Sequence, residues 1–256
     1  MIILTQPYCN NSNILFQNLH LDAFCRNNNL EFINPHLKPY REIFPNLEKW
    51  NYLAHSQHSK FLKLKNLIAK NFDGSRPPEV DRQWLLARKN LTTWVKGWYF
   101  RSHNDVVEAR DYYKSLFTPV CDVDIRREID AQKMRGKILS VHIRRGDYRR
   151  WQGGKYYFED SVYLECIQRT LDVSPDIQKI MLFSNESIDI GRYKNIGVNV
   201  VYSQGAWYED QWKMAQSDLI VGPPSTFSLW ASFVGKVPIW HVEESKSDVK
   251  FKVSNG

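Results

Sequence analysis

This chain of 256 residues contains no Cys-x-x-Cys pair. Its four cysteines are Cys9, Cys25, Cys121 and Cys166, widely separated along the sequence. Such spacing does not predict a zinc site, and a chain of this length needs no disulfide staples. We therefore expect reduced thiols.

Long apolar runs, internal repeats and low-complexity tracts are also absent. No stretch approaches the roughly 18 apolar residues of a membrane span, and the apolar opening at residues 1–5 is too short for a signal peptide. The chain is 43% hydrophobic and 14% aromatic, enough to bury a sizeable core. We expect a globular, cytoplasmic protein.

Acidic residues are fewer than basic residues, and the formal net charge is +7. This charge favours anionic partners such as nucleotide diphosphates, acidic glycans or lipid headgroups. Nucleic acid is not expected, because no motif interleaves basic and aromatic residues in a recognisable way. The densest basic segment, residues 60–70, is interpreted as a helix with its leucines in the core of a small domain. The alternative is a helix on a membrane surface, with peripheral contact at the inner face.

The carboxyl half alternates strand and helix patterns. We predict strands at 137–143, 178–183, 198–202, 218–221 and 237–242, and helices at 161–171, 208–216 and 227–234. This order is typical of a doubly wound nucleotide-binding domain. In the amino half, strands are predicted at 2–5 and 30–33, with a polar loop at 6–13 and a helix at 14–27. We place the domains at 1–130 and 131–256.

Two arginines follow the predicted strand 137–143. Arg144 and Arg145 precede Gly146 and Asp147, which end the strand with turn residues. Ligands of open parallel sheets collect at such carboxyl ends, and a guanidinium binds a phosphate with two parallel hydrogen bonds. The pair predicts a diphosphate site. The alternative is a basic loop held by ordinary salt bridges.

Polar residues follow three further strands. Ser225, Thr226 and Phe227 open a predicted helix, where hydroxyls and free N–H groups can bind a second phosphate, although an ordinary helix cap has the same pattern. Ser184 and Asn185 end another strand and suit a base or ribose. Asp210 either contacts the ribose or begins a helix.

These motifs resemble, in order and spacing, those of the α-1,2-fucosyltransferase family and its wider superfamily of α-1,6- and protein O-fucosyltransferases. The similarity lies in His-Ile-Arg-Arg-Gly-Asp at 142–147, Phe-Ser-Asn at 183–185 and Ser-Thr-Phe-Ser at 225–228. Residues 12–17 and 97–102 resemble two amino-terminal segments of the family more loosely. The resemblance covers nearly the whole chain.

The resemblance implies a GT-B fold, with two Rossmann-like domains facing a central cleft. It implies an inverting glycosyltransferase of carbohydrate biosynthesis that moves L-fucose from GDP-fucose to a glycan or glycolipid acceptor, with no metal and no further cofactor. Arg144 would stabilise the leaving diphosphate, and Arg145 and Asp147 would support it. The remaining donor-binding residues implied are His142, Asn13, Ser225, Thr226 and Phe227.

Several points stay open at this stage. The glycines of the family's amino-terminal loop are replaced by Asn10-Asn11-Ser12, which leaves room for another deoxyhexose donor, such as an L-rhamnose nucleotide, or for a non-catalytic glycan-binding module. Asp147 either orients an arginine or acts as the general base. Asp122 and Asp124 are interpreted as a helix start and not as a metal site.

Overall fold

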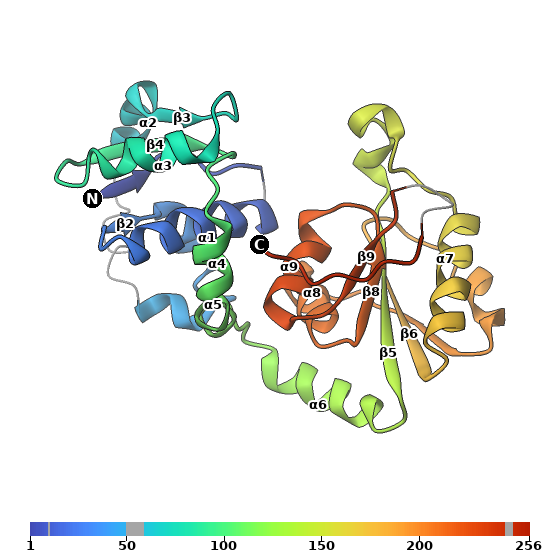
Figure 1. Ribbon diagram of the computed structural model, residues 1–256. Coiled ribbons are helices and arrows are strands. Elements are labelled where there is room, and N and C mark those ends of the chain that lie inside the picture. Colours follow the sequence, from blue (N-terminus) through green and yellow to red (C-terminus); the bar gives the residue numbers. More distant parts are fainter. Residues whose placement is uncertain (10, 50–58, 244–247) are drawn as a thin grey trace. The chain divides into compact units, whose positions relative to one another are not determined.

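The computed structural model of the chain describes residues 1–9, 11–49, 59–243 and 248–256. The chain divides into two compact units, one of residues 1–120 with 255–256 and one of residues 121–254. Each unit is built on a single parallel sheet with helices around it (Figure 1). The α/β class predicted from the sequence is confirmed.

The first unit has a parallel sheet in the order β2-β1-β4-β3. Two of these strands escaped prediction, because β3 is only three residues long and β4 alternates over only five. The strands are β1 (Ile2–Leu4), β2 (Phe32–Ile33), β3 (Lys70–Phe72) and β4 (Thr93–Gly97). The helices are α1 (Asn11–Asn27), α2 (Ser59–Ile68), α3 (Pro78–Leu86), α4 (His103–Glu108) and α5 (Arg110–Leu116), with short 3₁₀ helices at Pro35–Tyr40 and Pro45–Lys49.

Helix α1 begins at Asn11, three residues before the predicted start. The amide of Gln17 explains the short preceding loop, since it accepts a hydrogen bond from Tyr8 N at 3.0 Å and donates to Gln6 O and Gly97 O. These bonds hold the chain in a short loop directly after β1. Asn13 therefore lies in the first helical turn and not in an open loop, which corrects the loop prediction for residues 11–13, whereas residues 6–9 form a loop as predicted.

The interpretation of residues 60–70 was half right. Helix α2 forms, but Leu64 and Leu67 are 62% and 78% exposed and lie outside any core. The helix is turned so that polar Asn66 faces the sheet, where its Oδ1 accepts a hydrogen bond from Thr5 Oγ1 at 2.9 Å. The leucines at 64 and 67 must then point away, because they occupy the opposite face.

The second unit has five parallel strands in the order β7-β6-β5-β8-β9. In Figure 1 helix α7 lies on one side of this sheet, and α8 and α9 lie on the other. The strands are β5 (Lys137–Ile143), β6 (Ile177–Ser184), β7 (Asn199–Tyr202), β8 (Leu219–Gly222) and β9 (Ile239–His241). The helices are α6 (Asp122–Lys133), α7 (Asp160–Val173), α8 (Trp207–Ala215) and α9 (Thr226–Gly235), with 3₁₀ turns at Gly146–Arg149, Trp151–Gly154 and Ile190–Ile196.

The boundary between the units lies at 120/121 and not at 130/131. Helix α6 packs on α8, and Trp212 Nε1 donates a hydrogen bond to Asp122 Oδ1 at 2.8 Å. That contact ties α6 to the second unit. Asp122 thus begins the helix as expected, with its carboxylate also accepting from Arg126 Nε at 2.6 Å.

The core of the second unit is formed mainly by aliphatic and aromatic side chains of β5, β6, β8, β9 and α7. Its most buried members include Val141, Tyr163, Leu182, Val221 and Trp240. All four cysteines are free thiols. Within the described ranges, no helix has the length and apolar character needed to cross a bilayer.

Candidate functional site

Strands β5 and β8 are neighbours in the sheet, yet their following helices α7 and α9 cover opposite sides (Figure 1). Such a reversal of winding opens a crevice outside the carboxyl ends of the two strands, where ligands of doubly wound sheets bind. The residues that follow β5 and β8 are 144–148 and 223–227. These are the two segments in which the sequence predicts phosphate sites.

A hydrogen bond joins the two segments directly. Tyr148, in the turn after β5, donates its hydroxyl hydrogen to Pro224 O at 2.6 Å. Tyr148 is largely buried, and burial raises the pKa of its phenol. The segments after β5 and β8 therefore form one structure.

Arg144 is the partly accessible arginine of the site. Its side chain is 28% exposed, and Nη2 lies 2.9 and 3.0 Å from the two carboxylate oxygens of Asp147. The guanidinium carbon lies 5.4 Å from the centre of the Tyr148 ring. The Nε of Arg144 is buried and has no hydrogen-bond partner within the described parts of the chain. A buried, unpaired donor is costly, so this group is suited to an anionic ligand.

Arg145 points elsewhere, into a set of contacts within the protein, and its binding of the donor stays a prediction. The side chain is 11% exposed, with Nη2 bonded to Asp160 and Nε donating to Phe158 O at 3.1 Å. Asp160 also accepts from Tyr193 and Arg192. Successive side chains at a strand end point to opposite faces, so the second arginine enters a structural ion-pair network. Its remaining role is to hold the loop that carries Arg144.

Asn185 holds that loop through hydrogen bonds of both polar atoms of its side-chain amide. Its Oδ1 accepts from Arg145 N at 2.8 Å, and its Nδ2 donates to Arg145 O at 3.2 Å. Gly146, with φ of 59°, fits beside it because a Cβ there would lie 2.7 Å from Asn185 Nδ2. Ser184 Oγ accepts from Glu186 N. The Asn185 amide predicted to bind a base is thus already paired with the backbone of the Arg144 loop.

His142 is buried one pleat before Arg144, on the same side of β5. Burial, with smaller contributions from Arg144 and His241, lowers its pKa to about 3, so the imidazole is neutral. Its ring lies 5.2 Å from that of Phe227. Neighbouring Gly222 leaves the necessary space, because a Cβ on it would lie 2.8 Å from His142 O. The unpaired Nδ1 of His142 is a second buried polar atom without a partner in the described ranges.

Ser225 caps helix α9 through its Oγ, which accepts from Phe227 N at 3.3 Å. The cap interpretation is therefore confirmed for Ser225, whereas phosphate binding by this segment stays a prediction, for which the partly exposed Thr226 is accessible. The N-terminus of α9 presents its partial positive charge beside Arg144's loop.

Two further predicted donor residues lie outside the segments after β5 and β8. Asp210 Oδ1 accepts from Ser203 Oγ at 2.6 Å and from Gly205 N at 3.2 Å, which closes the turn between β7 and α8. Burial raises the pKa of this carboxyl. Asn13 belongs to the first unit, so its approach to a donor stays a prediction. Asn10 lies outside the described residues.

A row of packed aromatic side chains follows the loop after Arg144. Trp151 stacks between Tyr148 and Tyr156, with ring centres 4.7 and 5.4 Å apart, and it is 41% exposed. Tyr157 lies under Arg149. Tyr156 and Tyr157 thus pack against other side chains of this loop. Trp151 went unnoticed, although its place two residues before Gly153-Gly154 marks it as an exposed loop aromatic.

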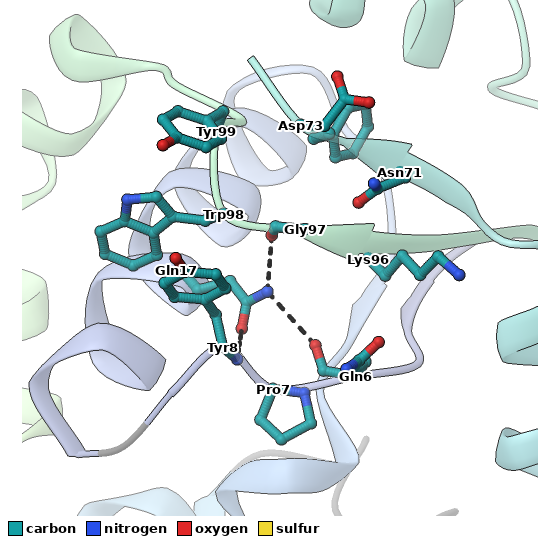
Figure 2. Close-up of a pocket in the computed structure, with 11 residues that line it drawn as sticks. Gln6, Pro7, Tyr8, Gln17, Asn71, Asp73, Lys96, Gly97, Trp98 and Tyr99 are labelled. Atoms are coloured by element: carbon teal, nitrogen blue, oxygen red, sulfur yellow. Dashed lines mark hydrogen bonds between the residues drawn. The ribbon is translucent and has the colours of Figure 1, made fainter. Parts of the chain in front are cut away.

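The first unit has a pocket at the carboxyl ends of β1, β3 and β4. The cavity has a volume of about 390 Å³. Figure 2 shows the rings of Tyr8, Trp98 and Tyr99 on one side and the polar side chains of Asn71, Asp73 and Lys96 on the other. The sequence did not predict this pocket, because β3 and β4 were not recognised.

Gln17 holds the base of the pocket through its three bonds to the backbone (Figure 2). Tyr8 stacks on Trp98 with ring centres 5.0 Å apart. Hydrogen bonds from the hydroxyl and N–H of Ser75 lower the pKa of Asp73, which is therefore an ionised hydrogen-bond acceptor. One aromatic wall and one polar wall suit a neutral, polyhydroxylated ring more than a phosphate.

Two Rossmann-like units in one chain define the fold class of GT-B glycosyltransferases predicted above. Solved structures with this fold include POFUT1 in complex with GDP-fucose, which has a TM-score of 0.53 and 11% identity over 91% of this chain and 93% of that one. The fucosyltransferase NodZ from Bradyrhizobium has a TM-score of 0.55 and 11% identity over 94% and 95%. NodZ α-1,6-fucosyltransferase co-crystallised with GDP has a TM-score of 0.53 and 12% identity over 94% of each chain.

At these identities the likeness concerns the fold. It reaches fucosyltransferases outside the α-1,2 group and does not single out the α-1,2 family. No family model matches the sequence. No curated protein matches it either.

Proposed function

We propose that the protein transfers L-fucose from GDP-fucose to a hydroxyl of a glycan, with inversion at the anomeric carbon. The observation that carries this proposal is the Arg144 guanidinium, held by Asp147 beside the N-terminus of α9 at the switch point. The fold supports it, because similar structures were solved with GDP-fucose and with GDP.

In the proposed reaction, the bond between the sugar's C1 and the β-phosphate oxygen breaks, and its electron pair stays with the departing GDP. Arg144 stabilises the charge that develops there. A charge pair at contact contributes about 4 kcal/mol at an effective dielectric near 20, which corresponds to roughly three powers of ten in rate. The neutral imidazole of His142 and the hydroxyl of Thr226 supply hydrogen-bonding groups beside the diphosphate.

The acceptor oxygen forms the new bond to C1 and loses its proton to a base. Asp147 is already engaged with Arg144, so we assign it the orienting role. We propose that the pocket lined by Tyr8, Trp98 and Asp73 receives a sugar ring of the acceptor, with the ring's C–H face on the aromatic wall and its hydroxyls toward the polar wall. In this proposal the first unit binds the acceptor.

Replacement of Arg144 by lysine tests the proposal. Arg144→Lys keeps one charge but loses the forked geometry, so kcat for fucosyl transfer should fall about 100-fold or more. Arg149→Lys is the matched control, since Arg149 is exposed in the same loop and stacks on Tyr157. Transfer at the wild-type rate by Arg144→Lys would refute the role of Arg144.

The donor sugar is tested separately. Hydrolysis and transfer rates with GDP-fucose, GDP-mannose and an L-rhamnose nucleotide should be highest with GDP-fucose. Preference for the rhamnose nucleotide would redirect the proposal to another deoxyhexose. Binding of glycans without binding of GDP would instead indicate a carbohydrate-binding module.

A further inference from the structure

One surface of the first unit exposes several large apolar side chains together. Leu64, Leu67 and Ile68 on α2 are 62%, 78% and 71% exposed, and Leu91, just before β4, is 59% exposed. The three residues on α2 stand at positions i, i+3 and i+4 and therefore share one face of the helix. We call these four residues the apolar face.

Helix α2 is fixed with this face outward by polar contacts on its other side. Asn66 Oδ1 accepts from Thr5 Oγ1 at 2.9 Å, and Asn66 O accepts from Lys96 Nζ at 2.8 Å. A rotation that buried the leucines would break both bonds. Their exposure is therefore built into the packing of the helix on the sheet.

The end of α2 and the turn that carries Leu91 belong to one surface. Ile68 and Leu91 line the same shallow hollow of about 390 Å³, together with Lys70, Trp84, Arg88, Thr92, Thr93 and Trp94. The guanidinium of Arg88 lies 4.0 Å from the centre of the Trp84 ring. The apolar face thus continues from the helix into the turn.

Positive charge surrounds the apolar face. Residues 59–72 contain four lysines, and residues 86–97 contain one arginine and two lysines. Neither segment contains an acidic residue. Lys60 and Lys63 are exposed on α2, one turn before Leu64 and Leu67, and Lys89 is exposed close to Leu91. Apolar side chains flanked by lysines match the chemistry of an anionic membrane surface.

We propose that the apolar face and its lysines dock the protein on an anionic lipid bilayer. The leucines enter the boundary between headgroups and acyl chains, and the lysines lie among the negative headgroups. Protein interfaces are depleted in lysine at their centres, so the lysine-flanked leucines favour lipid over a protein partner. The inference is independent of the proposed transfer reaction.

Vesicle co-sedimentation of the full chain tests this proposal. The protein should bind vesicles of phosphatidylcholine with phosphatidylglycerol, bind phosphatidylcholine alone far less, and dissociate as salt is added. Lys60→Gln combined with Lys63→Gln should weaken binding roughly 30-fold, since each lysine near such a surface contributes about 1 kcal/mol. Leu67→Gln should weaken it about tenfold.

Val173→Gln is the matched control, because Val173 is 61% exposed at the end of α7 in the other unit. It should leave vesicle binding unchanged, and circular dichroism should show that every variant is folded. Absence of binding to anionic vesicles at low salt would overturn the proposal. So would equal binding by the wild type and both groups of variants, or a dimer in light scattering that Leu67→Gln abolishes without any vesicle binding.

Discussion

At the scale of single residues, Arg144 and Arg145 differ more than their adjacency suggests. The guanidinium of Arg144 is partly exposed and held by an exposed carboxylate, Asp147, whereas that of Arg145 is buried against Asp160. Successive side chains point to opposite faces at the end of β5, so the two arginines enter different surroundings. One arginine can meet a ligand while its neighbour stabilises the loop.

This difference predicts that the same substitution destabilises the protein to different extents at the two positions. Arg145→Met should lower the free energy of unfolding by about 3 kcal/mol, because it leaves the buried carboxylate of Asp160 without its main partner. Arg144→Met should change it by less than about 1 kcal/mol, because that pair is partly exposed. Urea unfolding at pH 7 measures both values. Equal losses of stability in the two variants would contradict the assignment.

At the scale of elements, β5, β6 and the helices of the second unit were predicted to within a few residues. Dense β-branched runs such as Ile138–Ile143 make such strands easy to recognise. The first unit was harder, because short β3 and β4 give weak patterns and the early start of α1 depends on the distant bond from Gln17 to Gly97 O. The orientation of α2 depends likewise on Thr5 and Lys96, which no local pattern reveals.

In helix α9 the role of the capping residue and the role of the proposed ligand-binding residue can be tested separately. Ser225→Ala removes the hydroxyl that accepts from Phe227 N and should cost about 1 kcal/mol of stability. Thr226→Val should leave stability within about 0.5 kcal/mol but weaken GDP binding about three- to tenfold, through loss of one hydrogen bond. Urea unfolding and calorimetry with GDP separate the two effects. A larger loss of stability in Thr226→Val than in Ser225→Ala would contradict this division.

At the scale of the whole molecule, the second unit has its own complete core and sheet. Its carboxyl-terminal segment returns to the edge strand, where Ile239 pairs with Lys252, and Ser254 N donates to Ser232 Oγ at 3.0 Å. Both proposed phosphate-binding segments lie within residues 121–254. Folding and nucleotide binding should therefore be separable from the first unit.

A fragment of residues 121–254 should unfold cooperatively and bind GDP. At 100 times its dissociation constant, GDP should raise the fragment's free energy of unfolding by about 2.7 kcal/mol. Thermal unfolding with and without GDP, with the full chain measured in parallel, provides the comparison. If GDP stabilises the full chain but not the folded fragment, essential nucleotide contacts lie in the first unit.

The sequence by itself determined the α/β class of the second unit, the strand end at Ile143, the end of β8 to within one residue of Gly222, and the presence of arginines and hydroxyls just beyond them. These features depend on local hydrophobic patterns and turn residues. Only the tertiary structure decided that β5 and β8 are neighbours, that Arg145 and Asn185 support the loop, and that Arg144 remains available to a ligand. Those outcomes depend on strand order and on partners far away in the sequence, such as Asp160 and Pro224, which local patterns do not encode.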